Sequence, residues 1–179
     1  HIQQQRVVRS GERVTLIETM SNHFKSLGVR KTVIERAATV SEELLMNAIY
    51  DAPVDVDGKS IYNHLPRTTK IELTRDQYGW YRFGCDGNMA AVSVEDPFGK
   101  LTKATIIRYL DRNFVGKEGH GENEVKGGAG KGLYQLISTA DLTIFNVKAS
   151  QRTEVICLFN VDLNKSKSVD TPSFHYFFD

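Results

Sequence analysis

The order of helical and strand-like patterns constrains the fold of this chain more than any other feature of its sequence. Two amphipathic helices precede three strand-like runs, a third helix, a glycine-rich segment, a fourth helix and two further strand-like runs. Because strands do not alternate with helices, this order disfavours a doubly wound nucleotide-binding sheet and predicts an α+β fold. We expect a two-layer α/β sandwich, with a mixed and mostly antiparallel sheet that has its helices on one face. The expected helices are 11–27, 31–50, 101–110 and 133–140, and the expected strands are 69–75, 80–85, 89–95, 142–147 and 154–161.

Local signals set the boundaries of these elements. Pro53 stops the second helix, because proline cannot continue a helix. Asp86-Gly87, between two of the strand-like runs, is favoured in type I′ hairpin turns. Gly28 ends the first helix, whose apolar positions recur every three or four residues and predict its buried face: Val14, Ile17, Met20, Phe24 and Leu27.

Composition limits the classes of function. The 179 residues, 40% of them hydrophobic, fit one domain with a substantial core; we divide them into an N-terminal helix (1–27), a central domain (28–163) and a polar, then aromatic tail (164–179). The 23 basic residues are balanced by 22 acidic ones, so no overall field favours nucleic acid or anionic lipid as a partner. No apolar run approaches the roughly 20 residues of a membrane-spanning helix, and the N-terminus has no signal-peptide pattern.

The two cysteines indicate the compartment. Cys85 and Cys157 each lie in an apolar, strand-like run, and neither belongs to a CxxC pair. We expect two buried free thiols, which predicts a reducing and therefore cytoplasmic compartment. The five histidines have no metal-ligand spacing, so a zinc site is not expected.

The glycine-rich segment 116–132 is the first candidate for chemistry. It does not contain a P-loop, because that motif would need glycine at position 125 and serine or threonine at position 132, where the chain has Val125 and Gly132. Small residues at the start of a helix nevertheless present backbone N–H groups to an anion. The alternative is a flexible glycine linker.

Two polar residues of the second helix are the next candidates. Glu43 and Asn47 are four residues apart, so they lie on one helix face, within about 40° of each other. They sit beside the apolar positions Leu44 and Ala48, where a polar side chain costs free energy unless it is used. A carboxylate beside a carboxamide can orient Mg²⁺ and a water or hydroxyl, because both supply the oxygen ligands of hard cations. The alternative is a solvated helix shoulder.

Asp96 is the third candidate. An apolar strand-like run leads into it, and Pro97-Phe98-Gly99 follows as a turn. We therefore expect the carboxylate at a sheet edge over a cavity, where it can accept a hydrogen bond from an exocyclic amine such as that of adenine. The alternative is an aspartate that caps a turn.

Taken in order, these features resemble the ATP-binding domain, with the Bergerat fold, that is shared by sensor histidine kinases, gyrase, heat-shock chaperones and mismatch-repair ATPases. Residues 43–47 resemble its N-box, residues 94–99 its first glycine box and residues 128–133 its second, while Thr153 matches a threonine near adenine. The resemblance covers residues 28–162. It is strongest to the compact anti-sigma-factor serine kinases, because so few residues separate the two glycine boxes.

The resemblance implies a role for each matched residue. Asn47 would bind Mg²⁺, and Asp96 would accept the adenine amino group. Gly99 would let the base approach. Glu43 would be the general base that takes a proton from the attacking hydroxyl or water. The backbone of the second glycine box would hold the phosphates of ATP under a lid that spans residues 111–130, with contacts at Gly128, Gly130 and Gly132.

Four positions depart from the pattern of the family. Phe98 and Lys100 stand where the first glycine box has glycines, and Tyr50 and Asp51 stand where histidine kinases often have a basic residue. Asp51 either repels phosphate or helps to hold the metal. The missing positive charge is expected from two lysines of the glycine-rich segment, Lys126 and Lys131.

The resemblance predicts a signalling domain that binds ATP and Mg²⁺ and transfers the γ-phosphoryl group to a serine or threonine of a partner. That partner would be a regulatory protein, similar to an anti-sigma antagonist or a sigma factor, and the N-terminal helix could provide a homodimer contact. Two alternatives stay open. One is the catalytic half of a histidine kinase, for which the only helical phosphoacceptor candidate, His23, lacks an acidic neighbour. The other is a non-catalytic module that senses nucleotide or binds a partner.

Overall fold

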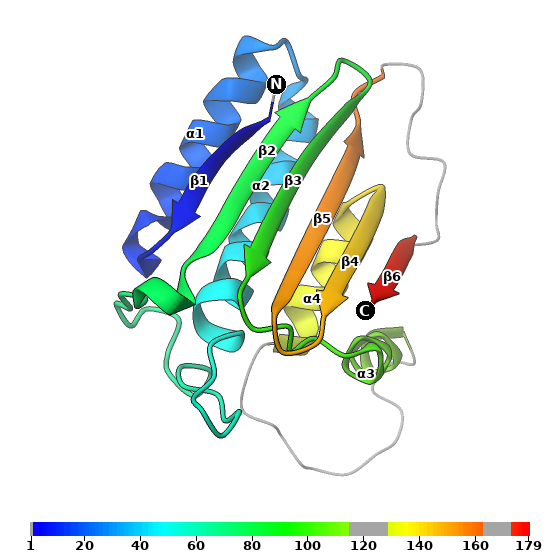
Figure 1. Cartoon of the computed structure of the whole chain (residues 1–179). Coiled ribbons are helices and arrows are strands. Elements are labelled where there is room, and N and C mark those ends of the chain that lie inside the picture. Colours follow the sequence, from blue (N-terminus) through cyan, green and yellow to red (C-terminus); the bar gives the residue numbers. More distant parts are fainter. Residues whose placement is uncertain (1, 115–128, 163–172) are drawn as a thin grey trace.

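One sheet of six strands organises the chain (Figure 1). The computed structural model describes residues 2–114, 129–162 and 173–179. Neighbouring strands are antiparallel except β4 and β6, which are parallel, so the protein has the expected α+β fold with a mixed, mostly antiparallel sheet. In their order across the sheet, the strands are β1 (Gln3–Val7), β2 (Gly79–Cys85), β3 (Met89–Asp96), β5 (Arg152–Asn160), β4 (Leu142–Lys148) and β6 (Phe174–Phe178).

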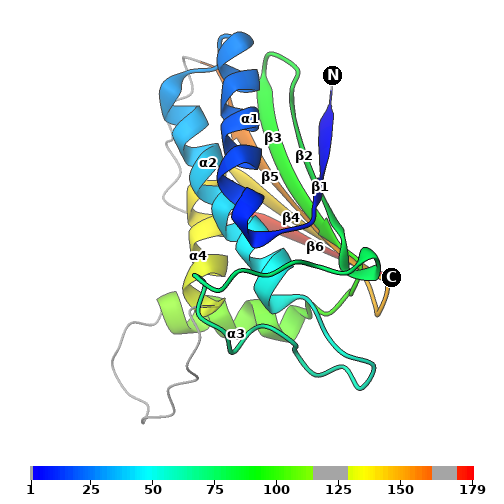
Figure 2. The same cartoon turned by 90° about the vertical axis from the view of Figure 1, so that its left-hand side faces the viewer.

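Helices cover one face of this sheet (Figure 2). Helices α1, α2 and α4 lie against it, and α3 packs beside α4 at one end. No helix of the described residues covers the other face, which is consistent with the expected two-layer α/β sandwich. None of these helices is long and apolar enough to cross a membrane. They are α1 (Arg13–Ser26), α2 (Lys31–Met46), α3 (Lys103–Phe114) and α4 (Ala129–Thr139).

The core lies between the sheet and the helices, because alternate strand residues point toward the helical layer. A buried hydrogen bond of 2.8 Å between the Ser41 and Tyr81 hydroxyls joins α2 to β2. Cys157 is a buried free thiol as expected, whereas Cys85 is half-buried and also free. The largest fully buried side chains are Met20, Phe24, Leu45, Ile49, Tyr50, Tyr81, Phe83, Ile106, Leu136, Ile137, Phe145 and Phe159.

The buried face of α1 differs in part from the prediction. Met20 and Phe24 are buried as expected, but Val14 is 64% exposed and Leu27 is 52% exposed. Leu16 takes the remaining buried position. A 3₁₀ turn precedes the helix, which begins only at Arg13, and its buried residues Leu16, Met20 and Phe24 are spaced four apart.

The expected strand 69–75 does not form. Its residues Ile71 and Leu73 are buried as the alternation indicates, but the segment makes only one isolated bridge, between Arg9 and Glu72. Backbone hydrogen bonds tie it to residues 8–10 beyond the end of β1. The alternating pattern therefore predicted the buried residues correctly. A strand also needs a neighbouring strand with which it forms a continuous ladder of hydrogen bonds, and this segment has none among the described residues.

The β2–β3 hairpin is confirmed, but its turn is not type I′. Gly87 has a φ of 97°, and Asn88 is not among the described residues with positive φ, whereas type I′ needs positive φ at both central residues. The Asp86 carboxylate accepts the N–H groups of Asn88 (2.9 Å) and Met89 (2.8 Å). These bonds place Asp86 before the turn, so the central pair is Gly87-Asn88, with glycine first as in type II′ turns.

The two edge strands were not expected from the sequence. The polar strand β1 precedes the predicted first helix, and β6 lies in the segment that was expected to be a tail. Phe174 packs edge-to-face on Phe145 of β4, with ring centroids 6.1 Å apart. The Tyr176 hydroxyl donates to the Leu101 carbonyl oxygen (3.3 Å), which links β6 to the segment before α3.

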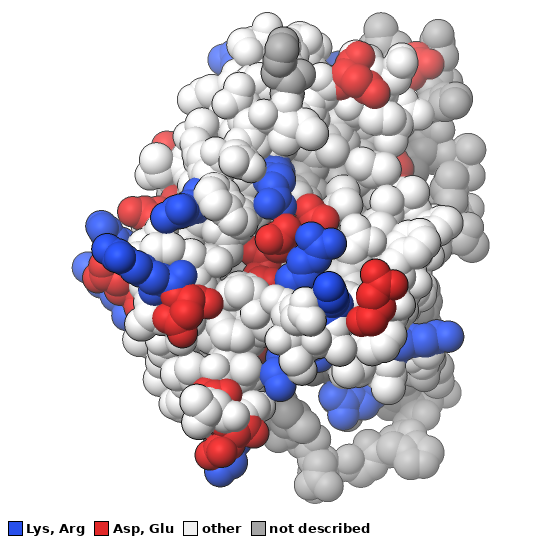
Figure 3. Space-filling view, viewed as in Figure 1, with Lys and Arg blue, Asp and Glu red and all other residues white. Residues whose placement is uncertain are grey.

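The helix-free face of the sheet carries charges of both signs near its centre (Figure 3). Glu95 and Glu154 are directly opposite each other on β3 and β5. Arg82 Nη1 on β2 lies 3.1 Å from the Glu95 carboxylate and 3.3 Å from the Glu154 carboxylate. Arg152 lies farther away, at 4.0 Å from Glu95. One arginine therefore bridges a like-charged pair across three strands and reduces the repulsion between its two carboxylates.

Candidate functional site

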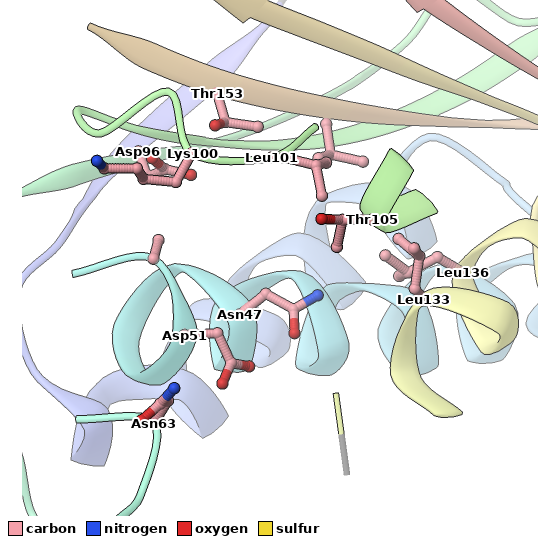
Figure 4. Close-up of a pocket in the computed structure, with 12 residues that line it drawn as sticks. Asn47, Asp51, Asn63, Asp96, Lys100, Leu101, Thr105, Leu133, Leu136 and Thr153 are labelled. Atoms are coloured by element: carbon pink, nitrogen blue, oxygen red, sulfur yellow. The ribbon is translucent and has the colours of Figure 1, made fainter. Parts of the chain in front are cut away.

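A cavity of about 260 Å³ lies where the end of α2 meets the sheet, α3 and α4 (Figure 4). It brings together three residues predicted from the sequence: Asn47, Asp96 and Thr153. Residues more than 100 positions apart thus share one site. The rest of the lining combines apolar side chains (Ala52, Leu101, Leu133, Leu136 and Val155) with polar ones (Asp51, Asn63, Lys100 and Thr105).

The sheet positions the first polar group of the cavity. Asp96 ends β3, and Thr153 is its register partner on β5. The Phe98 N–H donates to the Asp96 carboxylate (2.9 Å), so the following turn fixes the side chain. Burial raises the pKa of Asp96 to about 7, although hydrogen bonds from the turn and from the Thr153 side chain act in the opposite direction. A further hydrogen-bond donor in the cavity would therefore stabilise the ionised form of this carboxylate.

The end of α2 positions the second polar group. The helix continues into a π-helical turn, Asn47–Asp51, which the Ala52 N–H closes by donating to the Asn47 carbonyl oxygen (2.8 Å). Such turns are frequent at functional sites. Asn47 and Asp51 both line the cavity, and Arg67 Nη2 donates to Asp51 Oδ1 (2.6 Å). Burial raises the pKa of Asp51, and Arg67 opposes that rise.

Glu43 lies beside the cavity rather than in its wall. Its carboxylate contacts Gly132 in the first turn of α4, where a Cβ atom would collide with Glu43 Oε2. Burial and the neighbouring Glu42 raise the pKa of Glu43, and Arg67 lowers it. The proposed base thus lies on the last turn of α2 and faces the start of α4.

Neighbouring backbone atoms, rather than a ligand, explain why residue 99 is a glycine. Its φ is +61°, and a Cβ atom there would collide with the Lys148 carbonyl oxygen and lie 2.8 Å from the Ser150 and Gln151 nitrogens. These atoms belong to the last residue of β4 and to its connection to β5. The glycine is therefore required where the turn after β3 meets this connection. It does not line the cavity, so its expected role near a base stays a prediction.

The second glycine box lies partly in the described residues. Helix α4 begins at Ala129, before the expected start at residue 133, so Gly130 and Gly132 belong to its first turn. The N–H groups of a first helical turn have no partner within the helix. Outside the described residues lie Lys126, Gly128, residues 115–128 of the expected lid and the side chain of Lys131.

Two residues near the cavity were missed by the sequence reasoning. Asn63 lines the cavity, and Arg67 holds Asp51. Both belong to the polar connection between α2 and β2, which contains no recognisable motif. The one available signal was Asp51 itself, because a carboxylate near the end of an apolar helix needs a cationic partner.

No protein-family model matches this sequence, and a search of curated proteins finds no significant match.

Proposed function

We propose that this chain is a Bergerat-fold kinase that binds ATP with Mg²⁺ and phosphorylates a serine or threonine of a regulatory partner protein. The observation that carries the proposal is the convergence of Asn47, Asp96 and Thr153, from α2, β3 and β5, on one cavity with apolar walls. A mostly apolar cavity with a few convergent polar groups is the usual form of a small-molecule site. The two free cysteines fit a cytoplasmic location.

The sheet end of the cavity suits a purine base. Leu101, Leu136 and Val155 offer apolar walls for a planar ring. Asp96 accepts the exocyclic amine, which favours the ionised carboxylate over the protonated form that burial promotes.

The helical end of the cavity suits phosphates. The Gly130 N–H, in the first turn of α4, has no partner within the helix and faces an anion favourably because it lies at the positive end of the helix dipole. The side-chain oxygens of Asn47 and Asp51 are ligands that fit Mg²⁺. The bound metal would offset the negative charge of the triphosphate.

Glu43 supplies the base of the proposed reaction. It takes the proton of the acceptor hydroxyl while that oxygen bonds to the γ-phosphorus, and the bond to the β–γ bridging oxygen breaks to release ADP. The raised pKa of Glu43 makes its carboxylate a stronger base than an exposed glutamate. Removing Glu43 should therefore slow transfer and leave nucleotide binding intact.

Calorimetry with Mg·ATP tests the binding step. We expect Asp96→Asn to weaken ATP binding by about 10- to 100-fold. Asparagine keeps one acceptor oxygen for the Phe98 N–H but has an NH2 donor in place of the second oxygen, and a buried amine that loses its acceptor costs about 1–3 kcal/mol. Asp57→Asn, at an exposed position of the α2–β2 connection, is the matched control. Wild-type protein that binds no ATP would refute the proposal.

Labelling with γ-labelled ATP tests the transfer step. Label on a serine or threonine of a candidate partner supports the kinase proposal. Label on a histidine of the chain itself would instead support the histidine-kinase alternative, and tight binding without transfer to any partner would support the sensing module. Glu43→Ala should bind ATP and lose about 10²–10⁴-fold in transfer rate, while Asn47→Ala should lose Mg²⁺-dependent affinity.

A further inference from the structure

Three side chains with oxygen donors line one cavity: Asn47, Asp51 and Asn63. Figure 4 shows Asn47 and Asp51 projecting from the π-helical turn, with Asn63 below Asp51. Asn47 was expected to bind metal, whereas for Asp51 the sequence left open whether it holds the metal or repels phosphate. Asn63 belongs to no motif of the family pattern described above, and Asp51 stands where histidine kinases often have a basic residue.

Asp51 is held in a way that leaves one oxygen available. Arg67 Nη2 donates to Asp51 Oδ1, and Asp51 Oδ2 accepts no hydrogen bond from the described residues. The arginine is itself fixed, because its guanidinium lies over the Tyr50 ring at 5.0 Å from the centroid. The Tyr50 hydroxyl in turn donates to backbone carbonyl oxygens, at 2.7 Å from Thr69 and 2.9 Å from Arg67. The carboxylate is thus pre-oriented at the cavity wall.

The donor set indicates which cation the site would take. One carboxylate and two carboxamides offer only oxygen ligands, which suit Mg²⁺ or Mn²⁺ and disfavour softer metals. The described residues contain no group of three His, Cys, Asp or Glu side chains that could hold a metal without these amides. A site with one protein carboxylate also leaves coordination positions for phosphate oxygens and water.

We propose that Asp51 and Asn63 complete the divalent-cation site that begins with Asn47. The inference rests on the proposed function and deepens it, because it assigns the metal of the nucleotide a carboxylate ligand in this chain. Arg67 is a positioning residue, which fixes Asp51 through one oxygen and leaves the other to the cation. A bound cation would also explain how the acidic Asp51 is accommodated near the phosphates of a nucleotide.

A Mn²⁺ titration monitored by electron paramagnetic resonance tests the inference without measuring catalysis. The full chain is saturated with a non-hydrolysable ATP analogue, and the loss of the free Mn²⁺ signal gives the metal dissociation constant. We expect Asp51→Asn to weaken Mn²⁺ binding at least tenfold and Asn63→Ala to weaken it less, in the range found when metal-site partners are removed. Asp57→Asn, an exposed acidic position on the same connection, should bind Mn²⁺ as wild type does.

The controls separate this inference from the proposed function. Binding of the analogue by wild-type protein is measured first, and its absence refutes the proposed function and the metal site that depends on it. If the analogue binds and Asp51→Asn keeps wild-type Mn²⁺ affinity, the proposed function stands and the inference is overturned. Tighter binding of the Mn²⁺ complex by Asp51→Asn would show that Asp51 repels phosphate, which also overturns it. Arg67→Lys, which keeps the charge but not the planar guanidinium that lies over Tyr50, should reduce Mn²⁺ affinity while the nucleotide affinity measured in EDTA is unchanged.

Discussion

Asp96 makes the stability of the folded protein depend on pH. Burial raises its pKa from an ordinary value of 3.8 to about 7, so the folded protein holds this proton more tightly than the unfolded chain does. The free energy of unfolding should therefore fall as the pH rises from about 4 to 7, by up to a few kcal/mol (about 1.4 kcal/mol for each pH unit between the two pKa values).

Asp96→Asn should remove most of this pH dependence, because asparagine does not ionise. Urea denaturation at pH 5 and pH 8 measures the difference for both proteins. The variant should gain stability over wild type at pH 8 and approach it at pH 5. If the change in stability between pH 5 and pH 8 is equal for wild type, Asp96→Asn and the exposed control Asp57→Asn, Asp96 is not the source of the pH dependence.

A substitution at Gly132 should affect the proposed reaction without disrupting the fold. A Cβ atom there would collide with Glu43 Oε2, but that oxygen is the end of a flexible side chain and can move. Gly132→Ala should therefore keep the fold and gain up to about 1 kcal/mol from helix propensity. The displaced Glu43 should lower the phosphoryl-transfer rate toward that of Glu43→Ala.

The double variant Glu43→Ala/Gly132→Ala provides the control for this prediction. In that background, Gly132→Ala has no carboxylate to displace, so it should leave the transfer rate unchanged and still raise the thermal midpoint. A transfer rate for Gly132→Ala equal to that of wild type would show that the position of Glu43 does not matter.

The turn between β3 and α3 depends on Gly99. Alanine at this position would combine a left-handed φ with a collision against backbone atoms of the β4–β5 connection, which cannot shift as a side chain can. Gly99→Ala should lower the free energy of unfolding by more than about 2 kcal/mol. Gly28→Ala is the matched control: its φ is +77°, but a Cβ atom there meets nothing within 4 Å, and it should cost only about 1 kcal/mol. Equal losses in chemical denaturation would show that the backbone contact at Gly99 is unimportant.

The elements that the sequence predicted correctly are those with a strong local signal. Helices α1 and α2 have apolar side chains at helical spacing, and β2–β3 and β4–β5 are apolar runs separated by turn residues. The edge strands were missed because their stability comes from pairing with β2 and β4 rather than from their own pattern. The π-helical turn was missed because it ends the helix, so no later turn shows the shift in hydrophobic phase that its extra residue causes.

The sequence predicted the candidate site only at positions where the residue type itself indicated a function. Glu43, Asn47 and Asp96 are polar residues next to apolar runs, and such residues stand out in a sequence. Asn63 and Arg67 lie in a polar connection where any residue would look ordinary. Their positions depend on how the connection folds back against the end of α2, which no local pattern encodes.

The charge cluster on the helix-free face holds three strands together. Glu95 and Glu154 face each other directly, and like charges in that position are destabilising unless a cation lies between them. Arg82→Ala should therefore lower the free energy of unfolding by about 1–2 kcal/mol. The loss should shrink in high salt, which screens the repulsion.

Arg152→Ala is the matched control for this cluster. Arg152 is 54% exposed and lies 4.0 Å from Glu95, so its removal should cost less than that of Arg82. Urea denaturation at low and high ionic strength measures both variants. Equal losses for the two arginines, or a loss at Arg82 that does not depend on salt, would contradict the role given to the cluster.

The strand order has a consequence for synthesis on the ribosome. β3 is complete at residue 96, but its second partner, β5, begins at residue 152. While the chain emerges, the β2–β3 hairpin must therefore wait with one edge of β3 open, and an open edge of an apolar strand invites pairing with another chain. The sheet gains its central pair only when residues 152–160 have been made, and until then the open edge of β3 leaves the nascent chain prone to aggregation.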